Sequence, residues 1–161
     1  MTDSIGGVDS RDLNLRLTIA APRHLVWRCW TEGPLLEQWF TPAPWTTPKA
    51  IVDARTGGKS FIVMRGPDGT EMENHGIYLE VVPEEKLVFS DAYRDSETWT
   101  PGDKPFLTAV VTFADDDSGG TIYDARVWHW TMEDRKTHAE MGFEPGWTAA
   151  ARQLEALAKT L

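Results

Sequence analysis

The sequence has a single cysteine, Cys29, and this scarcity excludes an internal disulfide as a source of stability. No apolar run approaches the roughly 20 residues that a membrane-spanning helix needs. The N-terminal segment MTDSIGGVDS contains neither the basic region nor the apolar region of a secretory signal. We therefore expect a cytoplasmic protein that is not inserted in a membrane.

Basic side chains are also few. The 16 lysines and arginines are outnumbered by 25 aspartates and glutamates, which gives a formal net charge of -9. Affinity for nucleic acid depends largely on lysine and arginine side chains that displace counterions from phosphates. This balance excludes nucleic acid as the expected partner, and it disfavours binding to anionic membrane surfaces for the same reason.

Patterns that hold metals or phosphates are missing as well. The four histidines show none of the short spacings that mark zinc sites. The acidic run 115–117 lacks the spaced ligands and the closing glutamate of a calcium loop, so we interpret it as a hairpin turn. Gly57 and Gly58 precede a strand-like segment and not a helix, so they form no phosphate cradle. We expect neither a metal nor another cofactor.

The N-terminal part of the chain predicts one strand and two short helices. Apolar and polar residues alternate from Leu13 to Ile19, which is typical of a half-buried strand. Pro22 suits the first turn of a helix that ends at Gly33, and a second helix is predicted over 35–40. Three prolines in the segment TPAPWTTPK predict a surface loop over 41–49.

From residue 50 onward, turn residues separate about six further strands, with a polar loop predicted over 94–105. Consecutive hairpins and segregated helices predict an α+β fold with a curved antiparallel sheet of about six or seven strands. The length fits one domain over residues 12–161, preceded by a disordered tail over 1–11.

The C-terminal segment predicts a helix from Trp147 to Leu161. Its apolar residues recur at spacings of three and four, which places them on one helical face: Trp147, Ala150, Ala151, Leu154, Ala158 and Leu161. A helix with one apolar face must bury it, and the preceding strands offer a sheet on which to do so. The alanines are small, so we expect space for a ligand between this helix and the sheet.

Several motifs resemble one known family, and they occur in the expected order from Leu13 to Leu161. They are APRHLVWRCWTEGPLLEQWF, GGKSFIVMRGPDGTE, GIYLEVVPEEKLVFS, the GGT before the last strand and the GW of the C-terminal helix. The chain is similar to the activator of the ninety-kilodalton heat-shock protein ATPase family, a branch of the START-like (SRPBCC) superfamily. This resemblance implies the helix-grip fold, in which the sheet wraps around a long C-terminal helix.

The alternation of the strands predicts which residues line the cavity. We expect a small hydrophobic or aromatic ligand to contact Trp39, Phe61, Val63, His75, Ile77, Phe89, Val111, Phe113, Met141 and Trp147. For the strand at 121–130 either face can point inward. Two segments, WHW at 128–130 and AEMGFEPGW at 139–147, match no known activity.

Two other functions stay open. The chain can be a stress- or chaperone-related interaction module, in which Trp45 and Trp99 contact a protein partner or a second copy of the chain. It can also be a cofactor-free cyclase or hydrolase that uses His75 or Asp91, although no partnered nucleophile is visible and a binding protein is favoured over an enzyme. Asp91 and Arg65 either bind a polar group of a substrate or pair with each other.

Overall fold

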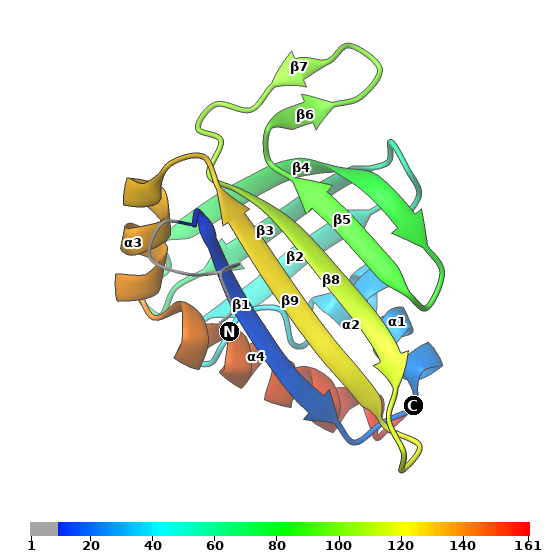
Figure 1. Ribbon diagram of the computed structural model, residues 1–161. Coiled ribbons are helices and arrows are strands. Elements are labelled where there is room, and N and C mark those ends of the chain that lie inside the picture. The colour runs from blue at the N-terminus through cyan, green and yellow to red at the C-terminus, as the bar shows by residue number, and fades with distance from the viewer. Residues whose placement is uncertain (1–9) are drawn as a thin grey trace.

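Residues 10–161, described by a computed structural model, fold into an antiparallel sheet with helices packed against it (Figure 1). In chain order the elements are β1 (Asp12–Ile19), α1 (Arg23–Thr31), α2 (Gly33–Leu36), β2 (Thr46–Val52), β3 (Lys59–Arg65), β4 (Glu71–Val82), β5 (Lys86–Ser90), β6 (Tyr93–Asp95), β7 (Thr100–Pro101), β8 (Leu107–Asp115), β9 (Thr121–His129), α3 (Met132–Glu140) and α4 (Phe143–Ala158). The predicted α+β class with the START-like arrangement is confirmed. None of the helices in this part of the chain is both long and apolar enough to cross a bilayer.

Seven strands form the main sheet in the order β1-β9-β8-β5-β4-β3-β2. β5 is therefore the central strand, and β1 and β2 are the two edges. Figure 1 shows α4 crossing one face of the twisted sheet, with α1 close to the C-terminal part of α4. We call the face toward α4 the inner face, because the core lies between it and the helices.

Alternation along β9 decides which of its two faces points toward the helices. Tyr123, Ala125, Val127 and His129 are buried, whereas the residues between them are partly exposed. Tyr123 and Ala125 belong to the core cluster that also contains the buried alanines of α4. The sequence did not define which face of this strand points inward. In the structure it is the face formed by Tyr123, Ala125, Val127 and His129.

The core packs the rings of the α1–α2 region against the inner face. The ring centroids of Trp30 and Trp39 lie 4.9 Å apart, edge to face. Both indole N–H groups have partners: Trp30 donates to the hydroxyl of Tyr123 at 3.1 Å, and Trp39 donates to the backbone carbonyl of Cys29 at 2.8 Å. These bonds fix the two large rings while their carbon atoms fill the core.

The prediction of a surface loop over 41–49 is wrong at its C-terminal end, because β2 begins at Thr46. β2 is an edge strand, and proline is tolerated at an edge because the backbone there need not donate to a neighbour on both sides. Pro48 lies in an irregular step of the β2–β3 register between Thr46 and Lys49. The edge position explains how a proline-rich segment still pairs with β3.

The prolines also shift two helix starts relative to the predictions. α2 occupies Gly33–Leu36 and not 35–40, because Pro34 lies in its first turn, where a missing N–H costs nothing. α4 begins at Phe143, upstream of the predicted start at Trp147, and Pro145 again falls in the first turn. Both prolines thus lie in the first turn of a helix that starts upstream of its predicted start.

Two further elements were not predicted. α3 forms a separate helix whose Thr131 cap accepts a hydrogen bond from the backbone N–H of Asp134 at 3.0 Å. The polar loop expected over 94–105 contains the short hairpin of β6 and β7, and we call residues 92–105 the arm. Figure 1 shows the arm projecting beyond the end of β5, with β6 close to β4.

The N-terminal tail was predicted over residues 1–11. Residues 1–9 lie outside the described part of the chain. Arg11 extends the pairing of β1 with β9, because the backbone N–H of His129 donates to the carbonyl of Arg11 at 2.9 Å.

Candidate functional site

Part of the predicted ligand-binding set lies in the core between the inner face and the helices: Trp39, Phe89, Val111, Phe113 and Trp147. Trp39, Val111 and Phe113 are buried, whereas Phe89 and Trp147 are only partly buried. The three buried residues have their surfaces covered by protein. Phe89 and Trp147 keep surface that a ligand can contact.

The expected cavity residues of β3 and β4 lie on the opposite face of the sheet: Phe61, Val63, His75 and Ile77. Their sequence neighbours Ile62 and Tyr78 belong to the core cluster, so the alternating residues point away from α4. The expectation that these side chains face α4 is wrong. In the segment KSFIVMR both the odd-numbered and the even-numbered positions include apolar residues, so the sequence does not define which face of the strand is buried against the helices. Met141 is 73% exposed in the turn between α3 and α4 and is likewise outside the core.

Phe89 is accessible although it occupies the centre of the covered face. Its partners in the neighbouring strands are Tyr78 and Ala109, which are 3% and 0% exposed. The buried core divides into two clusters, and both of them contact Phe89 and Trp147, which are themselves only partly buried. The helices therefore do not seal the middle of the inner face around Phe89.

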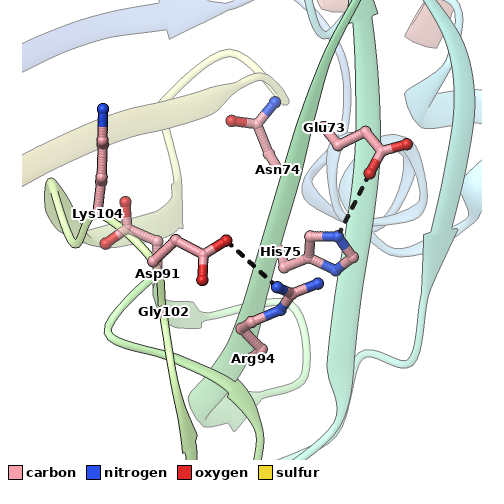
Figure 2. Close-up of a pocket in the computed structure, with 8 residues that line it drawn as sticks. Glu73, Asn74, His75, Asp91, Arg94, Gly102 and Lys104 are labelled. Carbon is pink, nitrogen blue, oxygen red and sulfur yellow. Dashed lines mark hydrogen bonds and ion pairs between the residues drawn. The ribbon is translucent and has the colours of Figure 1, made fainter.

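A polar pocket of about 360 Å³ opens where β4 and β5 separate. β4 pairs with β5 only from Ile77 onward, so its preceding residues border the space beneath the arm. Figure 2 shows the lining, which comprises Glu73, Asn74, His75, Asp91, Arg94, Gly102, Asp103 and Lys104. Asp91 follows directly on the last residue of β5, so the pocket lies at the end of that strand, between β4 and the arm.

Charges in this pocket are only partly paired. The guanidinium of Arg94 lies 3.3 Å from a carboxylate oxygen of Asp103, and Nε2 of His75 lies 3.8 Å from a carboxylate oxygen of Glu73 (Figure 2). Lys104 makes no ion pair with any residue in the range 10–161. Among its described residues the pocket thus offers Lys104 as a free cation, beside the Arg94–Asp103 pair and the contact between His75 and Glu73.

Asp91 has a structural task at the base of the arm. Its carboxylate accepts hydrogen bonds from the backbone N–H of Phe106 at 2.9 Å and of Leu107 at 3.2 Å. Burial raises the pKa of Asp91, and these backbone bonds oppose that rise. The alternative of a pair between Asp91 and Arg65 is wrong, because Arg65 binds Glu71, with Nε 2.9 Å from the carboxylate.

These contacts give no nucleophile to the hypothetical cyclase or hydrolase. The carboxylate of Asp91 is engaged by backbone amides, and His75 on the outer face contacts Glu73 and the ring of Phe61, whose centroid lies 4.7 Å away. Neither side chain is hydrogen-bonded to a serine, threonine or cysteine in the described range. The enzymatic hypothesis gains no support from this geometry.

A second group of rings lies at the end of β9. Nε2 of His129 and Nδ1 of His138 are 2.8 Å apart, and Nδ1 of His129 is 2.8 Å from the carbonyl oxygen of Arg11. The ring of His138 also contacts Phe106 and Phe143, each with its centroid at 5.2 Å. Burial and the neighbouring His129 lower the pKa of His138 from 6.5 to about 4. His138 is therefore a neutral imidazole at physiological pH.

Most of these polar residues carry no signal in the sequence. The sequence predicts an ordinary strand around Asn74 and a solvated loop around Arg94 and Lys104. No short spacing connects the three residues. The two segments that matched no known activity do meet in the fold, since WHW supplies His129 and AEMGFEPGW supplies Phe143 and Trp147. Unusual aromatic composition was the available signal.

Residues 20–159 match the family described as Activator of Hsp90 ATPase homolog 1-like protein. Protein NE0264 from Nitrosomonas europaea is 40% identical with a TM-score of 0.87, and the match covers 92% of this chain and 94% of that chain. Protein Ms6760 from Mycobacterium smegmatis is 29% identical with a TM-score of 0.76, over 97% and 95% of the two chains. A protein from Arthrobacter aurescens is 25% identical with a TM-score of 0.78, over 96% and 90%. No curated protein matches the sequence, so no activity follows from such a relative.

Proposed function

The chain belongs to the family of Activator of Hsp90 ATPase homolog 1-like proteins, and on that premise we propose that it binds a small aromatic or hydrophobic molecule between the sheet and α4. The observation that supports this function most directly is the partial accessibility of Phe89 at the centre of the inner face. In a domain whose only task is to be stable, a central aromatic ring between two buried partners is expected to be covered.

The chemistry around Phe89 suits a ligand that is mostly apolar and carries a polar group at one end. Phe89 and Trp147 supply apolar and aromatic surface for the body of the ligand. The polar pocket lies past the end of β5, the strand that carries Phe89, and contains Lys104 without an ionic partner in the described range. A few polar groups at the rim of an apolar site fix the orientation of a ligand.

Filling the space under α4 tests the proposal. Ala150 is 7% exposed on the buried side of α4, and Ala149 is exposed on the same helix. Ala150→Leu adds a branched side chain toward the inner face, whereas Ala149→Leu adds the same atoms toward solvent. We expect isothermal titration calorimetry with 2-methoxynaphthalene to show binding to the wild type and to Ala149→Leu, and at least ten-fold weaker binding to Ala150→Leu.

The unfolding free energies of the two variants separate the alternatives. If the inner face has room, Ala150→Leu keeps the stability of the parent. If side chains already fill the space, overpacking lowers the free energy of unfolding by about 1–3 kcal/mol. The second result, together with no binding to the wild type, would contradict the proposed function.

A second candidate, a protein-interaction module, has one specific observation in its favour. Trp99 at the tip of the arm is 58% exposed, its backbone φ is 53°, and the ring of Tyr93 lies edge to face against it at 5.3 Å. A large ring held on the surface at such a cost in backbone strain suits contact with an apolar patch of a partner or of a second copy. Sedimentation velocity of the wild type and of Trp99→Ser tests self-association, and identical monomer profiles would remove the second-copy form.

A further inference from the structure

The hydrogen bonds of the His129–His138 pair determine where its protons lie. The carbonyl oxygen of Arg11 can only accept, so Nδ1 of His129 carries the proton in the 2.8 Å contact between them. In the neutral ring Nε2 of His129 is then an acceptor, and it receives the proton of Nδ1 of His138 at 2.8 Å. Nε2 of His138 is left with a lone pair and no proton.

If one imidazole of the pair were protonated, the donor and acceptor roles in the contact between the two rings could be reversed. The surroundings of the pair disfavour such a charged form. His129 is 1% exposed, and neither imidazole has an acidic side chain within ion-pair distance among residues 10–161. A buried imidazolium without a counter-ion carries a large desolvation penalty. Both rings are therefore neutral, and their donor and acceptor roles are fixed in one direction.

The free acceptor, Nε2 of His138, is open to contact. Residues 10–161 give it no hydrogen-bond partner, and none of their buried side-chain nitrogen or oxygen atoms is left without one. Nε2 of the partly buried His138 must therefore be reachable from outside the protein, because a sealed atom would be an unsatisfied buried group. The ring itself is held by its aromatic neighbours, so the direction of the lone pair is constrained.

The ring of His138 lies close to a residue of the proposed ligand space. The centroid of Trp147 is 6.5 Å from His138 and 5.2 Å from Phe143. Trp147 also packs against both core clusters, as Phe89 does. The partly buried indole of Trp147 therefore packs against the same two clusters as Phe89 and also lies near the imidazole ring of His138.

We propose that His138 is a specificity-determining residue, which accepts a hydrogen bond through Nε2 from a hydroxyl group on an aromatic ligand held against Trp147. This inference rests on the proposed small-molecule function and names the ligand class: phenols and related ring alcohols. A neutral acceptor backed by the Arg11 carbonyl gives no favourable contact to a carboxylate, whose oxygens also only accept. Ring carboxylates are therefore disfavoured at this position.

Two probes of the same ring system test the ligand class. 2-Naphthol carries a hydroxyl donor, and 2-methoxynaphthalene has the same oxygen without the proton. One hydrogen bond to a neutral acceptor predicts that the wild type binds 2-naphthol about five-fold more tightly in calorimetry. Equal affinity for both probes would overturn the inference and leave the proposed function intact, whereas no binding of either probe would overturn both.

Matched variants separate a specific contact from a structural role of His138. In His138→Asn the side-chain amide replaces the donor to His129 and removes the distal acceptor, so the preference for 2-naphthol should fall to about one while the fold is kept. In His138→Gln the longer side chain returns an acceptor near the position of Nε2, and part of the preference should return. A preference that is unchanged in His138→Asn would contradict the inference.

Nitrogen NMR of the ligand-free protein gives a test that does not depend on binding. A long-range ¹H–¹⁵N correlation spectrum distinguishes the two neutral tautomers of each imidazole. We expect the Nδ1–H tautomer for both His129 and His138, with bare Nε2 atoms. The Nε2–H tautomer at His138 would refute the acceptor role whatever the calorimetry shows.

Discussion

Trp30 of α1 donates its indole N–H to the hydroxyl of Tyr123 of β9 at 3.1 Å, and the two residues are 3% and 2% exposed. This bond joins the first helix to the inner face of the sheet inside the core. Replacing Tyr123 by phenylalanine leaves the buried N–H of Trp30 without a partner. We expect Tyr123→Phe to lower the free energy of unfolding by about 1–3 kcal/mol, measured by urea denaturation.

Tyr93 provides the control for that change. It is 37% exposed on the arm, and Tyr93→Phe removes the same atom where water can replace its contacts. Its effect should stay within about 0.5 kcal/mol. Equal costs at the two positions would mean that the buried bond contributes nothing specific.

Gly102 controls how closely the arm approaches β5. A Cβ atom at this position would lie 2.1 Å from the carbonyl oxygen of Asp91, so Gly102→Ala must push the backbone of the arm away. We expect a loss of about 1–3 kcal/mol in the free energy of unfolding and faster limited proteolysis within residues 92–105. Gly146→Ala in α4 is the opposite control, because nothing lies within 4 Å of its added Cβ and alanine favours helix. Unchanged cleavage of the arm in Gly102→Ala would disprove the close packing.

The neutral His138 predicts a pH dependence of stability. Its pKa is about 4 in the folded chain and 6.5 as the ordinary value, so the unfolded chain takes up this proton first as pH falls. The contribution is complete above pH 6.5 and is lost progressively between pH 6.5 and about 4. Urea midpoints at pH 7.5 and 5 should differ less in His138→Asn than in the wild type. The titratable group that contacts this ring is His129. If the change in urea midpoint with pH persists in His138→Asn, other residues cause it.

Cys29 should be inert in the folded protein. It is 0% exposed, and burial raises the pKa of its thiol to about 11. The reactive thiolate is therefore both scarce and shielded near pH 8. We expect Ellman's reagent to modify Cys29 only at the rate at which the chain unfolds, and this rate should increase with urea. Immediate reaction in native buffer would contradict this burial.

The sequence predicted the order of the elements well where one periodicity was present. Leu13 to Ile19 alternate strictly, and β1 follows that pattern. The prediction failed in KSFIVMR, because apolar residues occur at both odd-numbered and even-numbered positions. The pairing with β4 decides which face of β3 points toward the helices, and strand propensity does not encode that pairing. Prolines misled in the same way, because Pro34 and Pro145 are tolerated in first turns that only the surrounding fold defines.

The candidate site was harder to predict than the fold. The positions of Phe89 and Trp147 against the core were predictable, because aromatic residues at inward-facing positions are a local signal. The pairing of His129 with His138 depends on how α3 packs against the end of β9, and nothing local in the sequence gives that packing. Contacts of this kind require coordinates, since they join segments through tertiary structure and not through spacing.

The irregular step at Pro48 has a consequence beyond the fold of one chain. A strand from a neighbouring molecule that tried to extend the sheet past β2 would meet a residue that cannot donate and a broken repeat of pairing sites. The open border of the sheet is thereby a poor template for fibril growth.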